Sequence, residues 1–357
     1  AWADIINSRY GGIYVKEYGR ALPVDFVMYD SKSDPATSAK FFEKLILEDK
    51  CDFTLAPYAD PEVAAVAPIV KKHEVPMLVG CGGAPEFYKA PNEWVTISTR
   101  EIGTWLKNYT SFINDKGLKT VGIVWTDEPY ADPVRYGFLV YLDQFKIDVI
   151  VDEKASPATI DWTPQITKLK AAKPDVTVFI SIVAEPHVSF FKQVKELGYK
   201  PKELHLCPAD LPVPALGLEM CDGITFDTSG LGVINPVYDG PWRRETMVEV
   251  FAKTGIDPTL LPDVASPDYA TLEILALGIE KAGTLDREKA NKAFRSLNYL
   301  SSSTGQMNFY TEYDLWKWGH LEGIYDSQWW PVQIQKGKMV ILAPPDKKTG
   351  EHVLYGG

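Results

Sequence analysis

Residues Thr120–Phe145 read TVGIVWTDEPYADPVRYGFLVYLDQF, and this stretch decides the fold class. Its apolar opening, rich in β-branched residues, predicts a buried strand over Thr120–Trp125. A turn containing acidic residues and proline follows, and an apolar-periodic run then predicts a helix over Val134–Phe145. A continuously apolar strand followed by a helix is the unit from which parallel sheets are built.

The same alternation of short apolar runs and longer amphipathic runs continues on both sides of this stretch. The other predicted strands are Val24–Tyr29, Phe53–Ala56, Met77–Val79, Trp94–Ile97, Asp148–Asp152, Val176–Ile182, Leu204–Cys207 and Gly223–Asp227. The other predicted helices are Thr37–Asp49, Glu62–Lys72, Gly103–Lys116, Pro164–Ala172, Val188–Leu197, Arg243–Thr254, Tyr269–Ala282 and Arg287–Leu297. Later β-structure is expected near Gln306–Tyr310 and within Gly323–Leu342. This order predicts βαβ units, with helices on both faces of parallel sheets.

Several predicted helices start with the same kind of dipeptide. A carboxylate or hydroxyl at the N-cap accepts bonds from unpaired backbone N–H groups, and a proline at the next position has no N–H to leave unpaired. The dipeptides are Asp34-Pro35, Asp60-Pro61, Asp132-Pro133 and Ser266-Pro267.

Length and composition limit the class of protein. At roughly 150 residues per domain, 357 residues correspond to about two domains. The formal net charge of −11 argues against a nucleic acid or an anionic membrane as partner. No apolar run approaches the ~20 residues that cross a bilayer. Ligands of open parallel sheets bind beyond the carboxyl ends of the strands, which in a two-lobed protein means the cleft between the lobes.

Five stretches carry a resemblance to a known family. They are VDFVMYDSKSDPATSAKFFEKLIL (Val24–Leu47), LAPYADPEVAAVAPIVKKHEVPML (Leu55–Leu78), TVGIVWTDEPYADP (Thr120–Pro133), LKAAKPDVTVFI (Leu169–Ile180) and PDYATLEILALGIEKAG (Pro267–Gly283). In pattern and order the chain resembles the type 1 periplasmic binding proteins, in the branch of Leu/Ile/Val-binding and amide-binding solute receptors of ABC importers.

The resemblance implies an α/β Venus-flytrap fold, with two Rossmann-like lobes of parallel sheet joined by three crossover segments. Lobe one would comprise residues 1–98 and 228–312, and lobe two residues 99–227 and 313–357. Hinge closure would trap the solute. The opening AWADIINSRYGG resembles the end of the family's first helix, so we expect the family's first strand and its ligand-contacting loop to precede this sequence.

The resemblance also assigns positions to the ligand site. In amino-acid-binding members, a serine and a threonine after the third and fourth strands hold the ligand carboxylate. Their matches here are Asp60 and Gly83, and the matching backbone contact is at Cys81. The acid that binds the ligand ammonium aligns with Ala209, beside Asp210. A fixed carboxylate repels a ligand carboxylate, so a plain α-amino acid is disfavoured unless it binds reversed.

Aromatic residues are expected to complete the site. Tyr58 follows the third strand, Trp125 ends a strand, and Tyr130 matches a ligand-contacting tyrosine of the family. Two alternatives stay open: Asp60 only caps its helix, and Trp125 only packs in the core. The expected ligand-binding residues are Tyr58, Ala59, Asp60, Cys81, Gly82 and Gly83 in lobe one, and Trp125, Tyr130 and Asp210 in lobe two.

Catalytic and metal-binding motifs are missing from the sequence. The five histidines have no paired metal spacing, and neither GxSxG nor CxxC occurs. The pair Asp127-Glu128 falls on a predicted loop and is interpreted as solvated surface. Gly80–Gly83 lacks the remainder of a phosphate-binding motif. No enzyme activity, metal or cofactor is therefore expected.

The sequence thus predicts an extracytoplasmic solute-binding subunit of an ABC importer, in the periplasm or at the extracellular face of the membrane. It would trap a small polar or aromatic-compatible solute, either amino-acid-like, an amide or an amine, and deliver it to a membrane permease. A monomer is expected, with a dimer as alternative. The alternative function is a cytoplasmic ligand-sensing regulator of the amide-sensor type on the same fold.

Overall fold

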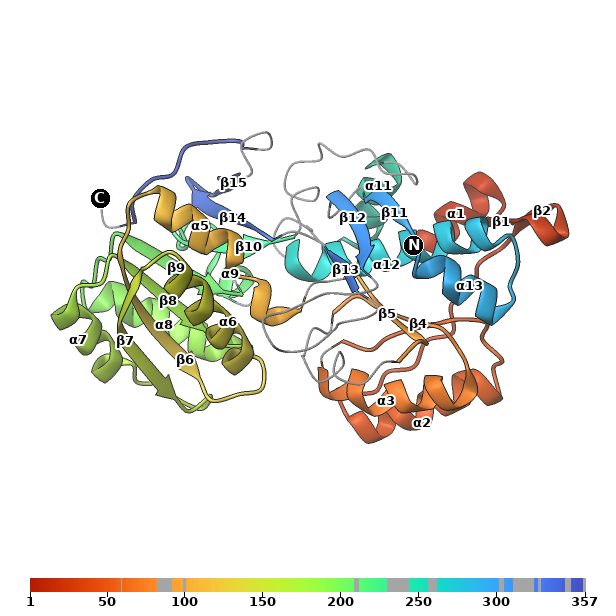
Figure 1. The fold of residues 1–357 in the computed structure, drawn as a ribbon, viewed down its shortest axis with the longest axis horizontal. Coiled ribbons are helices and arrows are strands. Elements are labelled where there is room, and N and C mark those ends of the chain that lie inside the picture. The colour runs from red at the N-terminus through yellow and green to blue at the C-terminus, as the bar shows by residue number, and fades with distance from the viewer. Residues whose placement is uncertain are drawn as a thin grey trace. The chain divides into compact units, whose positions relative to one another are not determined.

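A computed structural model of the chain describes residues 1–58, 60–81, 92–98, 101–208, 212–229, 244–255, 262–301, 305–310, 324–326, 329–343 and 348–355. The chain divides into two compact units (Figure 1). Unit 1 comprises Ala1–Glu101, Asn235–Pro258 and Val264–Gln328. Unit 2 comprises Ile102–Ile234, Thr259–Asp263 and Trp329–Gly357.

Unit 1 is built on a six-stranded sheet of order β11-β12-β13-β5-β4-β3. Its strands are β3 (Thr54–Leu55), β4 (Met77–Val79), β5 (Val95–Ile97), β11 (Asn298–Ser301), β12 (Gly305–Tyr310) and β13 (Ile324–Asp326). Strands β3, β4, β5 and β13 run parallel, whereas β12 and β11 are antiparallel to their neighbours. A short hairpin of β1 (Ile13–Val15) and β2 (Arg20–Leu22) flanks the 3₁₀ turn η1 (Lys16–Tyr18).

The helices of unit 1 are α1 (Trp2–Tyr10), α2 (Pro35–Leu47), α3 (Asp60–His73), α11 (Arg244–Thr254), α12 (Pro262–Ala282) and α13 (Arg287–Phe294). Helices α2 and α3 bury their apolar stripes with β4 and β5. This core contains Phe42, Ile46, Val63, Val66, Val70, Met77, Val79, Val95 and Ile97. Unit 1 is therefore a sheet with packed helices, as the alternating pattern predicted.

Two sequence predictions for unit 1 are wrong. Val24–Tyr29 is not a strand: the N–H and carbonyl of Val24 bond to the Asn7 side chain at 2.7 and 2.8 Å, and β3 ends the sheet. In addition, residues 313–357 were assigned to lobe two, but β13 pairs with β5 and β12 in the sheet of unit 1. The local apolar pattern could not identify the strand beside which β13 lies.

Unit 2 contains a seven-stranded sheet of order β15-β14-β10-β9-β8-β6-β7. Its strands are β6 (Thr120–Thr126), β7 (Asp148–Ala155), β8 (Val176–Ile180), β9 (Glu203–Cys207), β10 (Thr225–Thr228), β14 (Trp330–Gln335) and β15 (Lys338–Ile341). The first five strands in the sequence are parallel, and β14 and β15 add an antiparallel edge. The predicted α/β class with mostly parallel sheets is confirmed.

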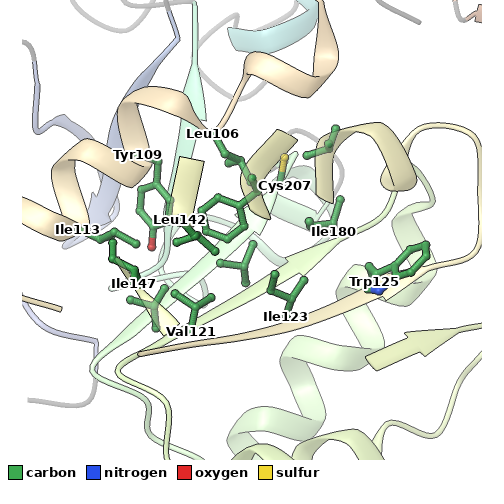
Figure 2. Packing of buried hydrophobic residues seen from close by; sticks show 14 of the residues in the cluster. Leu106, Tyr109, Ile113, Val121, Ile123, Trp125, Leu142, Ile147, Ile180 and Cys207 are labelled. Carbon is green, nitrogen blue, oxygen red and sulfur yellow. The ribbon is translucent and has the colours of Figure 1, made fainter. Parts of the chain in front are cut away.

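Helices cover both faces of the unit 2 sheet. They are α5 (Lys107–Asp115), α6 (Ala131–Gln144), α7 (Thr163–Ala172), α8 (Ala184–Glu196) and the short α9 (Pro212–Leu216), with the 3₁₀ turn η2 (Ile102–Thr104) before α5. Figure 2 shows side chains from α5 facing Val121 and Ile123 of β6. On the opposite face, Phe179 of β8 lies 4.4 Å from the Phe190 ring and 5.1 Å from the Trp162 ring, centroid to centroid.

The four dipeptides that were predicted to start helices occupy different positions in the structure. Asp34 is the N-cap of α2, and its carboxylate accepts a bond of 2.7 Å from the Thr37 N–H. Asp132 is instead the second residue of α6, which begins at Ala131. Ser266-Pro267 lies inside α12 rather than at its start. Asp60 is the first residue of α3.

Candidate ligand-binding site

In unit 1, the carboxyl ends of β3 and β4 bring three predicted residues to one edge of the sheet. The strands are parallel, with Leu55 paired to Leu78, and Tyr58 and Cys81 each follow three residues later. Tyr58 is 50% exposed, whereas Asp60 and Cys81 are half-buried. Ala59, Gly82 and Gly83 lie outside the described residues.

Asp268 of α12 also reaches this edge, and the sequence analysis missed it. A Cβ placed on Gly80 would lie 1.9 Å from Oδ1 of Asp268, so the carboxylate rests against the backbone where β4 ends. Only glycine leaves room for that contact. The Cys81 side chain is hydrogen-bonded to the Asp268 carboxylate. Gly80, a glycine directly after a buried strand, indicated that another group approaches the backbone closely there. The sequence alone did not identify that group as Asp268.

The electrostatic state of Asp268 is unusual for a carboxyl group. Solvent reaches its side chain, but the surrounding protein displaces much of its hydration. This desolvation raises the pKa of Asp268 to about 6, against the weaker opposing effect of the Cys81 hydrogen bond. The carboxyl group is thus mostly ionised at pH 7.5 and mostly protonated below pH 5.

Ser98 fixes the position of this part of α12. Its hydroxyl lies 3.1 Å from the carbonyl oxygen of Val79, at the end of β4, and 3.0 Å from that of Pro267. The hydroxyl is fully buried, so the contact joins the helix to the sheet without intervening bulk solvent. The Asp268 side chain is therefore placed by rigid elements and not by a loop.

In unit 2, Glu128 joins the carboxyl ends of two central strands. Its Oε1 accepts bonds from the Thr126 hydroxyl at 2.6 Å and from the Ile182 N–H at 2.5 Å. Thr126 ends β6 and Ile182 follows β8. The direction of the crossovers reverses between these two strands, and this is where such sheets bind ligands. The prediction of a solvated surface is wrong for Glu128; Asp127 is exposed and lies 3.2 Å from Lys154 Nζ.

Tyr130 lies at the same edge of the unit 2 sheet but is packed within the unit. Only 7% of the residue is exposed. Its hydroxyl is 3.5 Å from the sulfur of Cys207, the last residue of β9, and its ring meets that of Trp105 edge-on at 5.7 Å. Trp105 in turn stacks on Trp329, with the ring centroids 3.8 Å apart.

Trp125, labelled in Figure 2, is buried and has charged side chains as neighbours. Its indole N–H donates to Asp152 on β7 at 3.0 Å. The Arg135 guanidinium lies 4.9 Å and Lys154 Nζ 5.6 Å from the ring centroid, and Arg135 is also paired with Asp152. These contacts favour the alternative that Trp125 packs within unit 2. Ala209 and Asp210 lie outside the described residues.

Two buried histidines of unit 2 are held neutral. The Nε2 of His187 lies 2.7 Å from the carbonyl oxygen of Ser181, and burial lowers the pKa of His187 to about 4. Burial likewise lowers the pKa of His205 to about 3. His205 stacks on Tyr109 with ring centroids 3.8 Å apart. Neither histidine faces solvent, so both belong to the interior and not to the candidate site.

The described residues contain neither a metal-binding cluster nor a membrane-spanning helix. No group of three or more His, Cys, Asp and Glu side chains there could hold a metal ion. No described helix is both long and apolar enough to cross a membrane. None of the four cysteines forms a disulfide; Cys51 and Cys81 are half-buried, and Cys207 and Cys221 are buried.

Two α/β units with mostly parallel sheets, each with polar side chains at the carboxyl ends of its strands, define a class of small-molecule-binding proteins. A family model described as "Periplasmic binding protein" matches residues 1–338, and the chain belongs to this family. By this family it is a solute-binding protein and not an enzyme, as the sequence predicted.

Known proteins similar to this chain include amino-acid and aromatic-acid receptors. The "Leucine-, isoleucine-, valine-, threonine-, and alanine-binding protein" of Pseudomonas aeruginosa is 23% identical over 297 residues, which cover 81% of this chain and 75% of that protein. LivJ of Streptococcus pneumoniae, solved with isoleucine, has a TM-score of 0.76 and 18% identity, covering 96% of this chain and 92% of that one. An R. palustris solute-binding protein solved with 4-hydroxybenzoate has a TM-score of 0.74 and 19% identity, covering 99% and 91%. The two structures show the shared fold.

Proposed function

We propose that this chain is the extracytoplasmic solute receptor of an ABC importer. It captures a small polar or aromatic-compatible solute, either amino-acid-like, an amide or an amine, and delivers it to a membrane permease. The observation that carries the proposal is the position of the polar side chains: in both units they follow the carboxyl ends of parallel strands. Asp60 and Cys81 do so in unit 1, where Asp268 of α12 lies against Gly80, and Glu128 does so in unit 2.

Capture by such a receptor requires that the solute bind one conformation of the protein more tightly than another. The free energy that drives the conformational change is then limited by this difference in affinity. The site needs no bond-making chemistry for this role: its side chains bind, orient and desolvate the solute.

Support for the class of solute comes from the relatives and from the candidate residues together. The Pseudomonas relative is named for aliphatic and small amino acids, and the two solved structures hold isoleucine and 4-hydroxybenzoate. Tyr58 adds an exposed ring beside Asp60 and Cys81. A ring with a hydroxyl provides both apolar contact and hydrogen bonding to a small ligand.

The test is to identify what the protein binds. Purified protein is unfolded, and any small molecule that it releases is identified by mass spectrometry. The refolded protein is then titrated by calorimetry with the released compound, leucine, acetamide and choline. Saturable one-to-one binding of a small solute is expected. A correctly refolded protein that releases nothing and binds none of the compounds in the panel would contradict the proposal.

A further inference from the structure

We propose that Asp268 supplies a fixed negative charge to the ligand site of unit 1, so that the solute presents a cationic or hydrogen-bond-donating group there and not a carboxylate. This inference rests on the proposed function and goes further, because it names the chemistry that the site selects.

The Asp268 carboxylate lies at the edge of the unit 1 sheet where β4 ends. Its Oδ1 rests against Gly80, one residue before Cys81, at the edge of the sheet where Asp60 also lies. Helix α12 is held to this edge through Ser98, which contacts the carbonyls of Val79 and Pro267. The Asp268 carboxylate is thus positioned by helix α12 beside the predicted ligand-binding positions, and its residue is exposed to solvent.

In the part of the chain that the structure describes, no cationic side chain neutralises the Asp268 carboxylate. Within the described residues, the group that bonds to Asp268 is the Cys81 thiol, which carries no positive charge. The titratable residues that follow Asp268 within five positions on the same helix are Tyr269 and Glu273, and neither is cationic. A ligand carboxylate placed here would be repelled by the Asp268 carboxylate, whereas an ammonium or amide N–H would pair with it.

The ionised form of Asp268 is energetically unfavourable in the folded protein. Desolvation without a cation partner makes ionisation of Asp268 unfavourable, which the raised pKa expresses. A perturbed titratable group at the ligand-binding edge of an α/β sheet is characteristic of a functional site. A neutral amide of the same shape would carry no such cost. The charge is therefore better explained by what binds to it than by the stability of unit 1.

The experiment uses the two half-buried cysteines as a matched pair. Cys81 bonds to Asp268, and Cys51 lies before β3, at the opposite end of the same sheet. Alkylation of each thiol by iodoacetamide at pH 7.5 is followed by peptide mass spectrometry. The probes are benzylamine, benzamide and benzoate, which share a ring and differ in charge. The variants are Asp268→Asn and, as control, Asp25→Asn, which removes an exposed carboxylate elsewhere in unit 1.

Benzylamine is expected to slow alkylation of Cys81 saturably, and benzoate is expected to have no effect; Cys51 should react at an unchanged rate with every probe. Asp268→Asn should weaken the protection by benzylamine at least tenfold, and Asp25→Asn should leave it unchanged. Equal protection by benzoate, or unaltered protection in Asp268→Asn, would overturn the inference. If no probe protects Cys81, the solute released on unfolding decides: a carboxylic acid without a cationic or other hydrogen-bond-donating group overturns the inference but leaves the receptor function intact.

Discussion

The aromatic residues predicted for the ligand site differ in how much of their surface is buried against the rest of the protein. Trp125 and Tyr130 are each 7% exposed and have partners within unit 2, whereas Tyr58 is 50% exposed. A ring that is packed in the free protein gains little further burial from a ligand. Tyr58 is therefore the aromatic residue whose loss should affect binding more than folding.

Tyr58→Ala should weaken binding of the released solute by about 1–3 kcal/mol, because a buried aromatic anchor contributes about that much at a binding site. Tyr18→Ala is the matched control: Tyr18 is a tyrosine of unit 1 that is also about half exposed, at 52%, but lies on η1. Calorimetry measures both affinities. Equal affinities for Tyr58→Ala and the unaltered protein would remove Tyr58 from the site.

Asp268→Asn should stabilise unit 1 at pH 7.5 and have little effect at pH 4. The carboxyl group has a folded-state pKa of about 6, above its ordinary value of 3.8, so the folded state binds the proton more tightly. Its contribution to stability is therefore fully present at low pH and is lost as the pH rises through 6. Thermal unfolding at the two pH values measures the difference. A lower Tm for Asp268→Asn at pH 7.5 would contradict this account.

Asp60 and Cys81 were assigned to the site because they match family positions that follow strands, and their place in the site stays a prediction. Asp268 was not assigned to it, since its contact with Gly80 joins residues far apart in the sequence and depends on how α12 docks. Likewise, the interpretation of Glu128 as solvated failed because its partner, the Ile182 N–H, belongs to another strand's end. The sequence pattern indicates at which edge of a sheet a site lies. Which side chains contact one another at that edge depends on tertiary packing, which the local pattern does not reveal.

Among the helices, two Asp-Pro pairs of identical sequence have different roles. The Asp34 carboxylate bonds to Thr37 and caps α2, whereas Asp132 lies inside α6 and the N-cap, Tyr130, makes no side-chain bond to that helix. Capping requires the aspartate to precede the helix with an extended backbone, as Asp34 does with φ −103° and ψ 115°.

Asp34→Ala should therefore lower the Tm by about 2 °C, the change that loss of one capping bond produces in a protein of this size class. Asp132→Ala should change the Tm much less, because no capping bond is lost. Differential scanning calorimetry of the two variants compares them directly. Equal shifts would show that the Asp34 bond contributes nothing beyond charge.

Most strands and helices were predicted because burial on one or both faces leaves a periodic pattern in the sequence. Val24–Tyr29 shows the limit of that reasoning. Its residues favour a strand, but a strand also needs a neighbour for its backbone, and the N–H of Val24 finds the side chain of Asn7 instead. Strand β13 shows the same limit, since its partner decides its sheet.

The two units respond to acid in opposite ways. Asp268 makes unit 1 more stable as the pH falls toward 4, whereas His187 and His205 act against unit 2. Their folded-state pKa values, about 4 and about 3, lie below the ordinary 6.5, so the unfolded chain binds protons more readily. The stability that they confer is complete above pH 6.5 and is lost as the pH falls below it.

Between pH 7 and pH 5, unit 2 should lose about 2 kcal/mol of stability for each of these histidines. Hydrogen exchange measured by mass spectrometry, corrected for the intrinsic pH dependence of exchange, should show the loss in peptides from β8 and β9. His187→Gln retains a donor for the Ser181 carbonyl but cannot titrate, so it should reduce the loss. The same loss in His187→Gln as in the unaltered protein would exclude His187 as a cause.

The stacked pair of Trp105 and Trp329 has an optical consequence. Trp105 follows closely after the chain enters unit 2 at Ile102, and Trp329 is where it enters unit 2 for the last time. Asn108 donates to the Trp329 carbonyl, which fastens the second segment to the start of α5. Two indoles in face-to-face contact couple their electronic transitions, so a circular-dichroism couplet would signal, without any label, that both entry segments are seated.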